Sequence, residues 1–186
     1  MGHQDKNTNV LSDSNFLILG CEEFMTGRAG YVLGSMFLSQ RFPDLKGHLP
    51  SNIQLYDILD AMLKVGRVSF GASRTDPPLM YEWHETKYFG AAHGLSSILL
   101  AFLSVPGYLN DRCSERNRAD IKRSVEYVLG LQTATGNFPS SARWLTKVRP
   151  EEDELVHWCH GASGVVYLMA KGIFAQSFFS KNNLRV

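Results

Sequence analysis

Apolar positions recur with helical spacing in five segments of this 186-residue chain. Three segments, which each follow a glycine-containing turn, are apolar on nearly all sides: residues 31–38, 95–103 and 165–173. Residues 55–63 instead place apolar side chains at i, i+3, i+4, i+7 and i+8, the spacing of one buried helix face. Residues 121–129 form a similar face at i, i+4, i+7 and i+8. Ser51 is placed to cap the first of these two. We predict an all-α fold, since hairpin signals are missing.

The glycine turns are regularly spaced, because they begin at Gly27, Gly94 and Gly161, 67 residues apart. The amphipathic faces share this register, so the chain reads as three copies of a helical hairpin with the last helix missing. Nearly all-apolar helices predict an inner layer and amphipathic ones an outer layer, as in an α/α barrel or a solenoid. We predict a flexible tail at 1–15, a partial barrel domain at 16–176 and a polar tail at 177–186.

Composition narrows the function classes. The formal net charge is +1 and there is no basic stripe, so a nucleic-acid partner is not expected. Cysteines stand at 21, 113 and 159, an odd number far apart, which predicts no disulfide framework and a reducing compartment. No apolar run reaches the roughly 18 residues of a membrane span. The polar N-terminus has no signal region.

The candidate metal-binding side chains lie just before the glycine turns. A thiol and imidazoles in the segment 157–160 suit a soft divalent metal. A helix start also leaves N–H groups unpaired, and a glycine turn can bring them to a bound anion or thiolate. If the inner helices run in the same direction, their starts share one mouth. His93 and His160 then hold equivalent places, with Cys159 beside them.

Each of these residues also has a structural interpretation. Cys159 alone reads as a small buried apolar side chain, and His93 as a capping or core histidine. His157 can simply end the preceding loop. Trp83 and Trp158 are predicted to be core anchors rather than substrate platforms. The glycine turns can serve tight helix packing alone, and the acidic segment 151–154 is predicted to be a solvated loop.

Several motifs carry a family resemblance. They are Tyr81-Glu82-Trp83, Ala91-Ala92-His93-Gly94, Asn137-Phe138-Pro139 and Trp158-Cys159-His160-Gly161. Together they resemble the eukaryotic LanC-like proteins, relatives of the bacterial lanthionine synthetase C cyclases, over roughly residues 23–171. The resemblance implies an α/α toroid of seven hairpins with zinc at one mouth. This chain would hold the third to fifth hairpins as an incomplete arc.

The resemblance also implies roles for single residues. Cys159 is a zinc ligand, and its co-ligands are a Cys-His pair from the next hairpin, beyond this chain. His160 is not the family's histidine ligand. The family adds a thiol, glutathione in eukaryotic members, to dehydroamino acids in peptides or proteins, with zinc lowering the thiol pKa. An acid must then protonate the enolate carbon, so His93 is the expected catalytic residue.

Departures from the family keep other functions open. Ser97 stands where the family has a second glycine, and Cys159 alone cannot hold a zinc ion that takes three protein ligands. We therefore expect a truncated product without full activity. The alternatives are a non-catalytic module that binds glutathione or a protein, and an incompletely folded chain without activity. A cytoplasmic location is expected, with peripheral contact with the plasma membrane kept open.

Overall fold

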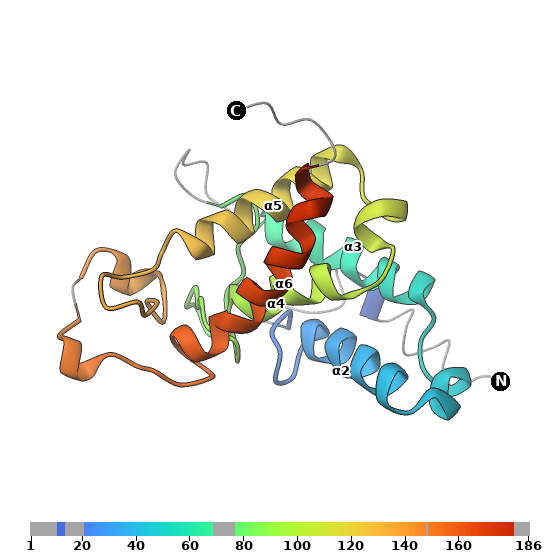
Figure 1. The fold of residues 1–186 in the computed structure, drawn as a ribbon, viewed down its shortest axis with the longest axis horizontal. Helices are drawn as coiled ribbons and strands as arrows, with labels where there is room; N and C mark the ends of the chain where they lie inside the picture. Colours follow the sequence, from blue (N-terminus) through green and yellow to red (C-terminus); the bar gives the residue numbers. More distant parts are fainter. Residues whose placement is uncertain (1–10, 14–20, 69–76, 148, 181–186) are drawn as a thin grey trace.

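The structure is a computed structural model that describes residues 11–13, 21–68, 77–147 and 149–180. All five predicted helices are present (Figure 1): α2 (Arg28–Arg41), α3 (Asn52–Val68), α4 (Leu95–Ser104), α5 (Glu115–Leu129) and α6 (Ala162–Ser180). Within the described ranges there is no β-strand, only two isolated bridges. The all-α prediction is therefore confirmed.

The predicted tails are described only in part. Of residues 1–15, positions 11–13 are described, and there Leu11 packs against the core while the Asp13 carbonyl accepts a bond from Arg28. The remaining residues of that tail lie outside the described ones. At the other end α6 continues to Ser180, past the predicted start of the polar tail at 177, and residues 181–186 are not described.

The outer helices form where their caps and apolar faces predict. The Gln54 amide donates to Ser51 Oγ at 3.4 Å and the Ser51 amide to Gln54 Oε1 at 2.9 Å, which is a reciprocal capping box. Ser114 caps α5 by accepting from the Asn117 amide at 3.2 Å. The predicted apolar face of α3 is buried throughout: Leu55, Ile58, Leu59, Met62 and Leu63.

Helix α4 lies at the centre of the layered arrangement. It packs against α2, α5 and α6, and Figure 1 shows α6 crossing it with α5 on one side and α2 on the other. Eight of its ten residues are buried, including Leu99 and Phe102. Helices α2 and α6 also pack against α4 but expose large apolar side chains such as Phe37 and Ile173. The predicted inner layer is thus complete only at α4.

The outer layer has η1 (Pro43–His48) after α2 and a π-helical turn, η2 (Tyr108–Arg112), before α5. The ends of α3 and α5 are joined by Arg67, which donates to Asp120 Oδ2 at 2.7 Å and to Asn117 at 2.7 Å. The long connection before α6 contains two 3₁₀ turns, η3 (Ala142–Leu145) and η4 (Glu151–Asp153). The acidic η4 is exposed, as predicted for this loop.

A buried ion pair holds the start of α2. Arg28, which is fully buried, donates from Nη1 to Glu22 Oε1 at 2.8 Å. Burial raises the pKa of the Glu22 carboxyl to about 7, although the nearby Arg28 charge opposes the rise. Among the described residues, Glu22 Oε2 and Arg28 Nε are buried without a hydrogen-bond partner. The pair therefore fixes the turn before α2 at a considerable desolvation cost.

Candidate functional site at the shared mouth of the inner helices

The turns that precede the three inner helices lie side by side. The Phe24 amide donates to the Ala92 carbonyl at 3.1 Å, and the Phe24 and Trp158 rings meet edge to face with centroids 5.2 Å apart. A Cβ added to Gly90 would lie 2.1 Å from the Cys159 carbonyl oxygen. Segments far apart in the sequence thus meet at one end of the helices, and the predicted shared mouth is confirmed.

The first backbone donor of each inner helix is already engaged. In α2 and α4 it bonds a carbonyl seven residues earlier, and in α6 a side-chain amide: Arg28 N to Cys21 O at 2.9 Å, Leu95 N to Tyr88 O at 3.0 Å and Ala162 N to Asn137 Oδ1 at 2.8 Å. These first donors are therefore not open to a bound anion or thiolate, contrary to the expectation. The loop itself satisfies them.

The glycines at these starts serve close packing, as the structural interpretation predicted. A Cβ at Gly27 would lie 2.4 Å from the Cys21 carbonyl oxygen, and one at Gly94 would lie 2.5 Å from the Gly90 carbonyl oxygen. Gly161 differs, because its φ of +97° also lies in the left-handed region. The third turn therefore repeats the position of the other two but not their backbone conformation.

His93 is the most constrained functional side chain at the mouth. Its Nδ1 lies 2.9 Å from Glu23 Oε2, and its ring stacks on Trp83 with centroids 5.3 Å apart and planes 4° from parallel. The side chain remains 30% exposed. With Nδ1 bonded to a carboxylate, proton exchange with a ligand falls to Nε2. The ring is therefore held in one orientation and partly exposed, unlike a core histidine.

Glu23 is a buried carboxylate with several donors. The Met25 amide bonds Oε2 at 2.7 Å, and Thr26 bonds Oε1 through its amide at 2.5 Å and its hydroxyl at 2.8 Å. Burial alone raises the pKa of this carboxyl, but the bonds from Thr26, Met25 and His93 outweigh burial and leave the pKa lowered. Glu23 is therefore held as an anion against the His93 ring.

The Cys159 turn lies at the same mouth, beside Gly90. The His157 and His160 backbones exchange two hydrogen bonds, at 2.8 and 3.1 Å, which closes a turn with Cys159 inside it. The His160 ring lies 5.6 Å from the Tyr88 ring, whose other neighbour is His93 at 6.2 Å. Burial, followed by the charges of His93, His157 and Arg149, lowers the pKa of His160. The lowered pKa favours the neutral imidazole at His160.

The two tryptophans do not act as core anchors, so that prediction is wrong. Trp158 is 39% exposed, although its ring meets that of Phe24 edge to face. Trp83 is half-buried and forms the platform on which His93 stacks. It stands at the start of a tight turn whose central residues, His84 and Glu85, have φ values of 45° and 58°.

A zinc site cannot be completed from the residues that the structure describes. His160 Nδ1 is buried and lacks a hydrogen-bond partner within the described ranges, so an unsatisfied nitrogen does adjoin Cys159. Yet these ranges contain no group of three His, Cys, Asp or Glu side chains placed to hold a metal ion. A catalytic zinc takes three protein ligands. The described residues alone therefore supply fewer ligands than a catalytic zinc requires.

A cavity of about 500 Å³ lies beside the mouth, within the connection before α6. Its lining includes Phe138, Trp144 and Arg149, and the Arg149 guanidinium stands 4.1 Å above the Trp144 ring. Neither His93 nor Cys159 belongs to this lining. The cavity is therefore a neighbour of the site rather than part of it.

Sequence reasoning missed three residues of the site: Glu23, Trp83 as a stacking platform, and Tyr88. The 67-residue repeat could have pointed to Glu23, because Glu23 is equivalent in register to Gly90 and His157 within the same turns. Tyr88 and Trp83 lie in the motif segments but carry no spacing that pairs them with His93. Their roles depend on how the connection before α4 folds back.

Comparison with known proteins agrees with this architecture. The sequence model of the family described as lanthionine synthetase C-like protein matches residues 3–184, which extends into both predicted tails. A zebrafish (Danio rerio) protein named glutathione S-transferase LANCL1 is 36% identical over 150 residues, covering 80% of this chain and 34% of the relative. The chain thus spans about a third of that relative's length. Within the described ranges, no helix has the length and apolar character needed to cross a membrane. With nearly its whole length matched, this chain belongs to the lanthionine synthetase C-like family.

Proposed function

We propose that the chain takes part in adding the glutathione thiol to dehydroamino acids in peptides or proteins. The observation that carries the proposal is the Glu23–His93 pair, which faces the Cys159 turn at a shared mouth. The name of the zebrafish relative, a glutathione S-transferase, supports glutathione as the thiol. The acceptor is proposed from the family resemblance of the Ala-Ala-His-Gly and Trp-Cys-His-Gly motifs.

The pair suits both proton transfers of such an addition. Nε2 of His93 takes the thiol proton, the sulfur bonds to the β-carbon of the acceptor, and the double-bond electrons form an enolate. The same imidazole then returns the proton to the α-carbon, so that S–H adds across the double bond. Glu23 holds Nδ1 throughout and stabilises the imidazolium between the two transfers.

An adduct assay tests this role. The chain is incubated with glutathione and a dehydroalanine peptide, and the adduct is followed by mass spectrometry. We expect His93→Gln to slow adduct formation by roughly 10²-fold or more, the usual loss of a general acid–base group. His48→Gln, at an exposed histidine of η1, is the matched control. An adduct rate that His93→Gln leaves unchanged contradicts the proposal.

We propose further that Cys159 is one zinc ligand, with the other protein ligands supplied from outside the described residues. Bound zinc would supply a lowered thiol pKa at this mouth. The metal content of the purified chain is compared between the unaltered protein and Cys159→Ser. Cys113→Ser is the control, because burial raises the pKa of Cys113 to about 11 and keeps it a thiol. Equal zinc content in all three proteins removes Cys159 from the ligand set.

A non-catalytic binding module is the second candidate function. The observation in its favour is the ligand set, since the described ranges hold no three-residue metal group. Calorimetry with glutathione distinguishes the two functions. Binding that survives His93→Ala and Cys159→Ala, with no adduct formed by the unaltered chain, favours the module. Adduct formation that depends on His93 favours the enzyme.

A further inference from the structure

The turn that carries Cys159 begins its helix in a different way from the two earlier turns. In α2 and α4 the first helical amide bonds directly to the carbonyl seven residues earlier, at 2.9 and 3.0 Å. The carbonyl seven residues before Ala162 belongs to Leu155, but the Ala162 amide bonds to the Asn137 side chain instead. The Leu155 carbonyl accepts from that same side chain at 3.2 Å. The carboxamide of Asn137 is thus inserted into a bond that the other two helices form directly.

The inserted carboxamide is buried and held in one orientation. Asn137 is 6% exposed. Its Oδ1 accepts from the Ala162 amide at 2.8 Å, while its Nδ2 donates to the Leu155 carbonyl and, at 3.1 Å, to Glu154 Oε2. Because an amide N–H only donates and a carbonyl only accepts, these partners fix which way the carboxamide points. Its own main-chain carbonyl accepts from the Thr133 amide at 2.9 Å. Asn137 therefore links the loop after α5 firmly to the start of α6.

The same turn also has a different backbone conformation. Gly27 and Gly94 precede their helices with φ values of −108° and −113°, whereas Gly161 has a φ of +97°. A Cβ added to Gly161 would lie 2.6 Å from Asn137 Oδ1, so the carboxamide occupies the space beside this glycine. The left-handed region costs glycine little. The inserted side chain and the left-handed glycine therefore occur together, at the third turn.

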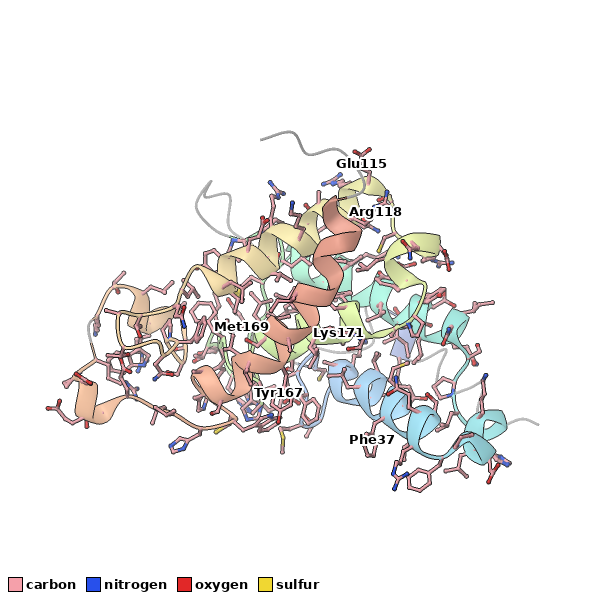
Figure 2. All side chains as sticks on the ribbon, viewed as in Figure 1. Phe37, Glu115, Arg118, Tyr167, Met169 and Lys171 are labelled. Carbon is pink, nitrogen blue, oxygen red and sulfur yellow. The ribbon has the colours of Figure 1, made fainter. Side chains whose placement is uncertain are left out.

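This turn determines where Cys159 lies. It is fixed on one side by the start of α6, through Ala162, and on the other side its Cys159 carbonyl packs against Gly90, three residues before His93. Figure 2 shows the connection that leads into it at the end of α5 opposite the labelled Glu115 and Arg118. A change in the backbone of the turn would therefore move the thiol relative to the His93 segment.

We propose that Asn137 is a positioning residue, whose carboxamide holds the third turn in the conformation that places the Cys159 thiol at the shared mouth. The inference rests on the proposed function in taking Cys159 as a working residue of the site. The equivalents of Cys159 in the two earlier turns are Met25 and Ala92. Those turns precede helices that begin without an inserted side chain. The bridge thus belongs to the turn of the three that carries a thiol at this position.

Removal of the carboxamide tests the bridge itself. We expect the Ala162 amide hydrogen to exchange roughly tenfold faster or more in Asn137→Ala, measured by NMR, because a buried hydrogen bond is lost. The Leu95 amide, which bonds the Tyr88 carbonyl, is the reference within the same molecule. Thr135→Val is the matched control, since it removes another bond to Glu154 and leaves the bridge intact. Unchanged exchange at Ala162 in Asn137→Ala overturns the proposal.

Thiol alkylation tests whether the bridge positions Cys159. The folded chain is treated with a pulse of iodoacetamide, and modification of Cys159 and of the buried Cys113 is quantified by peptide mass spectrometry. We expect Cys159 to react about fivefold faster or more in Asn137→Ala and in the milder Asn137→Ser, with the rate at Cys113 unchanged.

The two cysteines separate positioning from general stability. An unchanged rate at Cys159, or an equal rise at Cys159 and Cys113 in both variants, overturns the proposal, because the carboxamide would then not place the thiol or would only stabilise the whole fold. Neither measurement uses adduct formation. An adduct rate that His93→Gln leaves unchanged would therefore contradict the proposed function while the exchange and alkylation results still decide the role of Asn137.

Discussion

Glu22 and Glu23 are adjacent and equally buried, yet their environments push their pKa values in opposite directions. Glu22 is 3% exposed and Glu23 is 1% exposed. Burial raises the pKa of Glu22 to about 7 despite the Arg28 charge, whereas bonds from Thr26, Met25 and His93 outweigh burial at Glu23 and lower its pKa. Burial is the largest influence on both carboxyls, and the additional donors at Glu23 are what turn the shift of its pKa downward.

Within one turn, Glu22 belongs to a structural ion pair and Glu23 contacts a residue of the candidate site. Glu22 points toward Arg28 and the start of α2, while Glu23 points toward the His93 ring at the mouth. A poorly satisfied ion pair is placed where rigidity is needed, and a fully bonded carboxylate where an imidazole must be oriented. The two residues can therefore be altered separately, and the expected effects differ in size and in pH dependence.

Arg28→Met should have the largest effect. It leaves the Glu22 carboxyl buried without its partner, and breaking such a pair costs about 3–5 kcal/mol of unfolding free energy. Urea unfolding at neutral pH measures the loss. The control is Arg41→Met at the exposed end of α2. Losses of similar size in both variants would mean that the buried pair does not hold this turn.

Glu22→Gln should change the pH dependence of stability. Because the folded-state pKa of Glu22 is raised, its contribution is complete below about 4.5, the ordinary value, and is lost as pH rises through about 7. The unaltered chain loses up to about 3 kcal/mol of unfolding free energy over this pH range. The unfolding free energy of Glu22→Gln lacks this dependence on pH. Urea midpoints measured across this pH range give the comparison, with the exposed Glu126→Gln on α5 as control. Parallel profiles for the unaltered chain and Glu22→Gln would exclude a raised pKa.

The fold was predictable from the sequence because the 3.6-residue apolar period and the 67-residue repeat are local and redundant. Five helices, the cap at Ser51 and the shared mouth follow from them. For the site, motifs singled out His93 and Cys159, which the structure places near the shared mouth, while their roles stay predictions. The Glu23–His93 contact joins residues 70 positions apart through a bend in the turn. Nothing in the pattern of either segment shows which way that carboxylate points.

The engaged helix starts show a second reason for failure. A glycine turn before a helix equally predicts donors open to a ligand and donors satisfied by the loop. The choice depends on whether the preceding carbonyls fold back, as Cys21 and Tyr88 do. Trp83 and Trp158 were misassigned because a large aromatic side chain in a motif reads as core. Their exposure depends on the packing of three distant turns.

Glu23→Gln should cost less than either change at the buried pair. The oxygen of the new amide still accepts a hydrogen bond, but its NH₂ group faces a neighbouring group that is itself a donor. This mismatch costs about 1–2 kcal/mol of unfolding free energy at neutral pH. In the unaltered chain, the lowered pKa gives a contribution that is present above about 4.5 and lost as pH falls through the folded-state value. In urea unfolding from neutral pH to below about 4.5, the contribution of Glu23 to the free energy of unfolding should fall as pH falls. This slope is opposite in sign to the slope expected for Glu22.

A spectroscopic readout separates orientation from stability in the same variant. Nitrogen NMR of His93 should report a proton on Nδ1 in the unaltered chain and a mixture of tautomers in Glu23→Gln. Glu22→Gln serves as the neighbouring control and should leave the tautomer unchanged. An unchanged tautomer in Glu23→Gln would show that the stacked Trp83, rather than the carboxylate, orients the ring.

Glu85→Gly should have the smallest effect and the opposite sign. Glu85 has a φ of 58°, in the left-handed region that costs a side-chain-bearing residue about 1–2 kcal/mol, whereas glycine adopts it freely. Glycine's larger unfolded-state entropy offsets part of that gain, so a net stabilisation of about 0.5 kcal/mol is expected in thermal or urea unfolding. Glu82→Gly, outside the positive-φ positions of the described chain, should destabilise instead. Because this turn carries Trp83 while Glu23 bonds His93 from another segment, relief of the turn should leave the His93 tautomer unchanged. A shifted tautomer would mean that the turn, rather than Glu23, orients the imidazole. The contrast between Glu22 and Glu23 would then concern stability alone.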